Sequence, residues 1–67
     1  MDIRRLLGLN VQRLRKQKGW SQEELADRAG LHRTYLSGVE RGVRNPTITI
    51  VEKLAKALEA PMTTLLG

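Results

Sequence analysis

The chain has 67 residues, the length of one small domain, and its formal net charge at pH 7 is +5. It contains no cysteine, which excludes disulfides and thiolate metal sites, and no apolar run approaches the roughly 20 residues of a membrane span. The N-terminus also lacks the apolar core and cleavage site of a signal peptide. We therefore expect a single cytoplasmic domain over residues 1–67 with a polyanionic partner.

The first predicted helix covers residues 3–18. Its apolar side chains recur at helical spacing on one face: Ile3, Leu7, Val11 and Leu14. Gly8 lies inside this segment, at a cost on the order of 1 kcal/mol relative to alanine. Gly19 follows as a helix-ending residue. The pattern predicts an amphipathic helix with its apolar face in the core.

A second, shorter helix is predicted from about residue 22 to residue 29. Ser21 and Glu24 have the S-x-x-E spacing of a capping box, in which each side chain accepts a hydrogen bond from a free N–H of the first turn. Trp20 and Leu25 flank this box as a hydrophobic staple. Gly30 follows, and it can adopt the positive φ that a tight turn between two helices needs.

The third predicted helix starts at Arg33 and ends near Gly42. Leu31 and Leu36 repeat the staple spacing, which makes His32 the N-cap residue, although histidine is a poor cap. Two short amphipathic helices around one glycine have the spacing of a helix-turn-helix. The second helix of that motif enters the major groove of DNA.

Two further helices are predicted in the last third of the chain. Thr47 is the N-cap of a helix that runs to about Glu59. Its predicted buried residues are Ile48, Val51, Leu54, Ala55 and Leu58. Pro61 then interrupts the chain, and a final turn is predicted from Met62 to Leu66.

Positive charge is unevenly distributed along the chain. Residues 1–44 hold ten basic and five acidic side chains, whereas residues 45–67 hold two of each and are neutral. The whole excess therefore belongs to the part that carries the predicted helix-turn-helix. This placement favours a DNA partner for that part and a less electrostatic role for the C-terminal helices.

The run from Gln22 to Glu40 and the loop RGVRNPT after it resemble the Cro and phage-repressor type of helix-turn-helix proteins, the XRE family. Within this run, HRTYLSGVER at residues 32–41 is similar to the controller proteins of restriction-modification systems. The resemblance covers residues 9–66. It implies an all-α, compact five-helix domain of the lambda-repressor-like kind, which binds DNA as a transcriptional regulator.

The resemblance also has consequences for single positions. It implies a partly buried ion pair between Arg15 and Glu40, two hallmark residues of the family. The chain departs from the family pattern at His32, where Ser, Thr or Asp is usual, and at Glu59, where a helix-ending glycine is frequent. The first departure concerns base recognition and the second only a helix boundary.

The predicted recognition helix presents an outward stripe: Arg33, Thr34, Ser37, Gly38 and Arg41. In the family this stripe enters the major groove. Arg33 can donate two hydrogen bonds to guanine, and Thr34 can offer a hydroxyl or touch a thymine methyl. The missing side chain at Gly38 would permit close approach to DNA. An ordinary solvated helix face is the alternative, and we favour DNA contact for Arg33, Thr34 and Ser37.

Five more residues are candidate DNA contacts. The ring of Tyr35 either packs at the rim of the core or contacts DNA, and His32 either caps its helix, touches phosphate or reaches a base edge. Gln22 is at the first position of its helix, an anion site, and family members place this glutamine on the DNA backbone. Arg44 and Asn45 are expected to contact the backbone from the following loop, with loop solvation as the alternative.

The expected function is a transcriptional regulator that binds double-stranded DNA at a palindromic operator, without a membrane partner. Its homodimer interface is expected on the C-terminal helices, through Ile50, Met62, Leu65 and Leu66. The chain offers no constellation for a catalytic site, a metal site or a cofactor. Two alternatives are an antitoxin of the same fold, which represses its operon and binds a toxin, and a membrane-surface module that uses the first helix.

Overall fold

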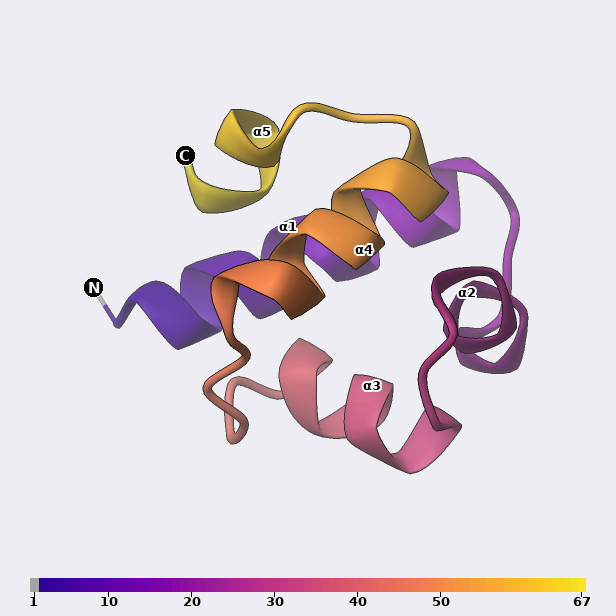
Figure 1. Ribbon diagram of the computed structural model, residues 1–67, viewed down its shortest axis with the longest axis horizontal. Coiled ribbons are helices and arrows are strands. Elements are labelled where there is room, and N and C mark those ends of the chain that lie inside the picture. Colours follow the sequence, from indigo (N-terminus) through magenta and orange to yellow (C-terminus); the bar gives the residue numbers. More distant parts are fainter. Residues whose placement is uncertain (1) are drawn as a thin grey trace.

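The computed structural model describes residues 2–67, which form five helices and no strand. They are α1 (Ile3–Gln17), α2 (Gln22–Ala29), α3 (Arg33–Glu40), α4 (Ile48–Leu58) and α5 (Met62–Leu66). Helices α1 and α4 run through the middle of the molecule, with α2 and α3 beside them and α5 at the opposite edge (Figure 1). The expected five-helix, all-α domain is confirmed. Within residues 2–67 no helix is both long and apolar enough to span a membrane.

Helix α2 has the predicted bounds because its caps form as expected. The Ser21 hydroxyl accepts a hydrogen bond from the Glu24 N–H at 3.1 Å, and Gly30 adopts a φ of 70° at the C-cap. The Glu24 carboxylate instead accepts from Arg28 Nε at 2.7 Å, so only half of the capping box is observed. Trp20 packs against the core as a staple residue and carries the Arg28 guanidinium over its ring.

The other helix ends differ slightly from expectation. Helix α3 begins at Arg33 as predicted but ends at Glu40, two residues before Gly42. Helix α4 begins after Thr47, whose hydroxyl accepts from the Ile50 N–H at 3.3 Å. It ends at Leu58, and the C-cap residue Glu59 adopts the left-handed conformation with a φ of 56°. A side chain therefore occupies a backbone conformation that normally favours glycine.

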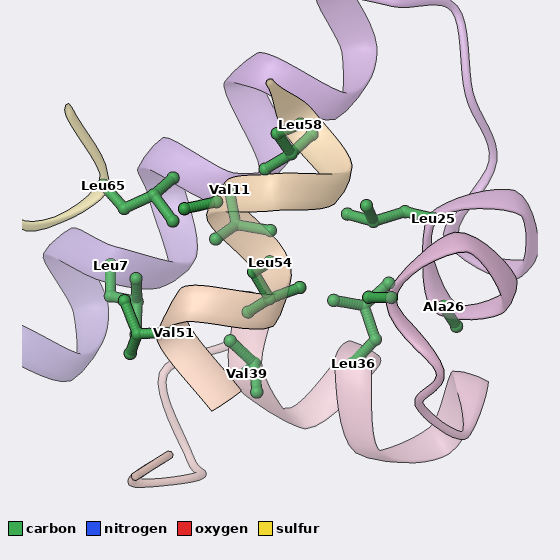
Figure 2. Packing of buried hydrophobic residues seen from close by; sticks show 12 residues of the cluster. Leu7, Val11, Leu25, Ala26, Leu36, Val39, Val51, Leu54, Leu58 and Leu65 are labelled. Carbon is green, nitrogen blue, oxygen red and sulfur yellow. The ribbon is translucent and has the colours of Figure 1, made fainter. Parts of the chain in front are cut away.

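One hydrophobic core joins all five helices (Figure 2). Its buried members are Leu7, Val11, Leu25, Ala26, Ala29, Leu36, Val39, Val51, Leu54, Ala55, Leu58 and Leu65. The apolar face of α1 is buried in this core. It is therefore not available for contact with a membrane surface, as the membrane-surface alternative requires.

Three apolar positions contradict the sequence-based expectation. Ile3 and Ile48 were predicted to face the core, but they are 54% and 66% exposed. Each is the first residue of its helix, and the core begins only one turn further on, at Leu7 and Val51. Leu65 was predicted to be poorly buried, yet it is fully buried. Helix α5 packs on α1, where Asn10 Nδ2 donates to the Leu65 carbonyl oxygen at 2.8 Å.

Gly8 lies where α1 crosses the end of α3. A Cβ atom at this position would clash with the Val39 carbonyl oxygen and would lie 2.6 Å from the Glu40 carbonyl oxygen. Both obstacles are backbone atoms and cannot rotate away. Packing thus explains why a glycine stands inside α1 despite its low helix propensity. The backbones of α1 and α3 approach too closely for any other residue.

Candidate nucleic-acid interface

Helix α3 divides cleanly into an inner face and an outer face. Leu36, Val39 and Glu40 are buried, which fixes the helix against the rest of the molecule. Figure 2 shows Leu36 and Val39 pointing from α3 into the core. The outer face carries three exposed residues at the helix start, His32, Arg33 and Thr34, and two half-buried ones, Tyr35 and Ser37. The start of α3 is therefore the part available to a large partner.

A buried ion pair ties the end of α1 to the end of α3, as the resemblance implied. Arg15 Nε donates to Glu40 Oε2 at 2.7 Å and Arg15 Nη2 donates to Glu40 Oε1 at 2.9 Å. A third hydrogen bond, from Arg15 Nη1, reaches the Trp20 carbonyl oxygen at 2.8 Å. The hydrogen bonds that Arg15 donates to the Glu40 carboxylate raise the pKa of Arg15 above its ordinary value. This bidentate geometry holds α3 in one orientation.

Gln22 joins the same group of side chains. Its Nε2 atom donates to Glu40 Oε1 at 3.1 Å, so the side chain is anchored at the start of α2 beside the end of α3. A carboxamide nitrogen carries two N–H groups, and this hydrogen bond uses one of them. The second N–H, together with the free backbone donors of the first turn of α2, gives Gln22 the chemistry to bind a phosphate.

His32 does not cap α3. It is the N-cap residue by conformation, with a φ of −75° and a ψ of 141°, but its side chain makes no cap hydrogen bond. One of the three roles considered for His32 is therefore wrong, and phosphate or base contact remains. Arg33 and Thr34 follow on the first turn, where both side chains are exposed. These three neighbours are exposed together at the start of α3.

Gly38 does not lie on the outward surface, and this expectation is wrong. The residue is buried, and a Cβ atom there would lie 2.7 Å from Arg44 Cγ. The guanidinium carbon of Arg44 is 5.6 Å from the centre of the Tyr35 ring. The loop after α3 folds back over the helix, so Arg44 covers Gly38 and lies above Tyr35. Sequence periodicity did not reveal this contact because it links the helix to a loop.

The loop that carries Arg44 and Asn45 is held to α3 by its backbone. The N–H groups of Val43 and Arg44 donate to the Gly38 carbonyl oxygen at 3.0 and 3.3 Å. Arg44 and Asn45 are both exposed, and both lie close to the recognition helix in the chain. The arrangement thus keeps Arg44 next to the outer face of α3, whereas Asn45 lines a hollow beside the starts of α1 and α4.

A second basic group, not among the candidate DNA contacts named above, lies where α1 passes the end of α3. Arg5 and Arg41 line a hollow of about 190 Å³ together with Leu9 and Glu40. Arg5 packs so closely on Gly42 that a Cβ there would lie 2.9 Å from Arg5 Cγ. The sequence indicated this group through the net charge of residues 1–44 and through Arg41 of the predicted outward stripe, but it did not single out Arg5. Among residues 2–67 no three His, Asp or Glu side chains come together as a metal site requires.

The model of the helix-turn-helix family HTH_3 matches residues 11–65, most of the chain. The chain belongs to this family. A similar sequence is the uncharacterized HTH-type transcriptional regulator y4dJ of Sinorhizobium fredii, which is 52% identical over 58 residues. That alignment covers 87% of this chain and 75% of the relative. The predicted resemblance to XRE-type helix-turn-helix proteins is confirmed.

Two solved structures share the fold closely. The restriction-modification controller protein C.AhdI from Aeromonas hydrophila has a TM-score of 0.90 and 44% identity, with 92% of this chain and 94% of that chain covered. The biofilm regulator SinR in complex with DNA has a TM-score of 0.86 and 40% identity, with 91% and 98% covered. The likeness to controller proteins, expected from residues 32–41, is confirmed.

Proposed function

We propose that this chain is a transcriptional regulator that binds double-stranded DNA by placing the start of α3 in the major groove. The observation that carries the proposal is the exposed first turn of α3, whose helix is fixed from behind by the Arg15–Glu40 pair. The fold matches that of SinR in a DNA complex, which supports the same use of this helix. The family comprises DNA-binding regulators and controller proteins, not enzymes.

The residues divide into two proposed roles. Base contact belongs to Arg33, with Thr34, Ser37 and His32 beside it, because these side chains extend from the outer face of α3. The proposed contacts to the DNA backbone are Gln22, Arg44 and Asn45, which flank α3 on the preceding helix and the following loop. Tyr35 lies at the border, half-buried beneath Arg44. Phosphate contacts set the register, and base contacts specify the sequence.

A symmetric homodimer on a palindromic operator is part of the proposal. The charge-neutral C-terminal part carries apolar side chains that one copy leaves uncovered, with Ile48 strongly exposed and Ile50, Met62 and Leu66 only partly buried. Leu65 is excluded from this surface by its burial in the core. A two-fold interface there would present two copies of α3 about 34 Å apart, one turn of DNA. Sedimentation showing only monomer at tens of micromolar, with and without operator DNA, would contradict it.

We further propose a controller role in a restriction-modification system, with residues 1–67 acting as one domain in the cytoplasm. The run at residues 32–41 and the 44% identity with C.AhdI support the controller role. The single core, shared by all five helices, supports the one-domain assignment.

The decisive experiment measures binding of the chain to the DNA upstream of its own gene, with a random duplex of equal length as the control. Fluorescence anisotropy at two salt concentrations gives both affinity and salt dependence. A regulator binds the upstream DNA at least 10³-fold more tightly than random DNA. Equal affinity for both duplexes would contradict sequence-specific regulation by this site.

A further inference from the structure

The space above Gly38 is filled by the stem of one side chain. Three atoms of Arg44 approach the place where a Cβ of residue 38 would lie: Cγ at 2.7 Å, Nε at 3.3 Å and Cδ at 3.5 Å. All three belong to a side chain and none to the backbone. The three atoms nearest to a Cβ of residue 38 thus all belong to Arg44, and the absence of that Cβ is what lets the stem of Arg44 lie there.

Two further contacts fix Arg44 at the same place. Its backbone N–H and that of Val43 both donate to the Gly38 carbonyl oxygen, which brings the loop back onto α3 at this residue. Its guanidinium lies over the Tyr35 ring, three positions before Gly38 in the helix. Residues 35 and 38 are neighbours on one face of a helix, so ring and glycine form one continuous surface.

A guanidinium that lies over an aromatic face keeps its N–H groups free at the edges of its plane. Arg44 is exposed in this arrangement, so those groups remain able to donate to a phosphate. An arginine without such support samples many rotamers and loses that freedom when it binds. Holding it in place beforehand removes part of that loss, a gain of roughly 2- to 10-fold in affinity.

We propose that Gly38 and the Tyr35 ring form a seat that holds Arg44 ready for contact with the DNA backbone. Gly38 and Tyr35 are positioning residues in this proposal, and Arg44 is the residue that touches DNA. The proposal rests on the proposed function and adds to it a reason for a glycine inside the recognition helix. It also assigns the Tyr35 ring, which packs against the core, a second role in positioning Arg44.

The test is Gly38→Ala, alone and combined with Arg44→Ala. Alanine is the better helix former, but Arg44 Cγ lies near the base of its side chain, so the loop must shift slightly, and circular dichroism first checks that the variant is folded. Its affinity for the upstream DNA should fall roughly 2- to 10-fold, because Arg44 is displaced. In the Arg44→Ala background the same substitution should change affinity by less than about 2-fold, since there is no arginine left to position.

A second measurement examines the seat without DNA. In the NMR spectrum of the unsubstituted chain, the Arg44 side-chain resonances should be shifted by the ring current of Tyr35. Gly38→Ala and Tyr35→Leu should both move them toward the values of a free arginine, whereas Tyr35→Phe, which keeps the ring, should not. Arg13→Ala is the control for affinity, because it removes an equal charge from the side of α1 that faces α5.

Three results would overturn the seat. One is an unshifted Arg44 resonance in the unsubstituted chain. Another is full affinity of Gly38→Ala when Arg44→Ala is weakened, and the third is an equal loss from Gly38→Ala with and without Arg44. If the unsubstituted chain binds no duplex, the proposed function is wrong instead, and the NMR shifts alone then decide whether the seat exists.

Discussion

Arg15 reaches from the last turn of α1 to the carboxylate of Glu40 at the end of α3, with two hydrogen bonds of 2.7 and 2.9 Å. The Glu40 side chain is only 2% exposed, so the pair is shielded from water. Helix α1 therefore sets the orientation of the recognition helix, although α1 lies behind it. The ion pair that fixes the proposed DNA-binding surface therefore lies on the buried face of α3, opposite to that surface.

Replacing Glu40 with Gln should lower the free energy of unfolding by about 3 kcal/mol, because it leaves the Arg15 charge buried and unpaired. Urea denaturation followed by circular dichroism measures this loss. Glu24→Gln is the matched control, since it breaks the exposed Glu24–Arg28 pair and should cost less than about 1 kcal/mol. Equal losses in the two variants would contradict a structural role for the buried pair.

Gly8→Ala should destabilise the fold by about 2 kcal/mol or more, despite the better helix propensity of alanine. Its Cβ would press against backbone carbonyl oxygens of α3, and α1 would have to move away. Thermal unfolding checks this, with Gly38→Ala as the comparison, because the atoms nearest to that Cβ belong to the side chain of Arg44 and not to the backbone. A Gly8→Ala variant as stable as the unsubstituted chain would mean that α1 and α3 are not held at this distance.

Glu59→Gly should raise the free energy of unfolding by about 0.5 to 1 kcal/mol. The left-handed φ of 56° costs a residue with a side chain about 1–2 kcal/mol, and the extra freedom of glycine in the unfolded chain offsets part of the gain. The substitution also removes the exposed Lys18–Glu59 ion pair, a small loss. Glu59→Gln isolates that loss, and a Gly variant less stable than the Gln variant would refute the backbone argument.

Arg33→Ala should weaken binding to the operator by about 1–3 kcal/mol and relax the preference at one base pair of each half-site. The loss on random DNA should be much smaller, because a contact to a base edge carries the sequence information. Anisotropy titrations on both duplexes measure this, after circular dichroism shows that the variant is folded. Equal losses on operator and random DNA would make Arg33 a phosphate contact and pass base reading to Thr34, His32 and Tyr35.

Arg44→Ala should weaken binding to all duplexes alike and reduce the salt dependence of log K by about one unit of slope. Neutralising one phosphate fewer releases one counterion fewer, whatever the base sequence. Titrations between about 50 and 200 mM salt, where the affinity for DNA falls steeply, measure this slope. Arg13→Ala serves as the control for charge loss, and an unchanged slope for Arg44→Ala would place its side chain away from the backbone.

Local signals in the sequence predicted the helices well, because caps and turns are local. Ser21, Gly30 and Thr47 each have the predicted role, and α2 has the predicted bounds. Burial at helix starts was predicted less well. Ile3 and Ile48 match the apolar period but are more than half exposed, because a periodic pattern does not show where a helix leaves the core.

Contacts between distant segments were accessible from sequence only where the family resemblance supplied them. The Arg15–Glu40 pair came from that source, and the structure confirms it. The close approach at Gly8 and the cover of Gly38 by Arg44 were missed, because each depends on how two segments cross in space. The roles of the candidate DNA contacts stay predictions until they are tested by the variants above.

The inward anchoring of α3 makes its outer residues replaceable. Arg33 and Thr34 have exposed side chains, so exchanging them should alter the preferred operator with little loss of stability. Positions 35, 38 and 44 are different, since a change at one alters the surroundings of the other two. A library built to redirect this protein to new DNA sites should therefore vary the first turn of α3 freely and treat those three positions as one unit.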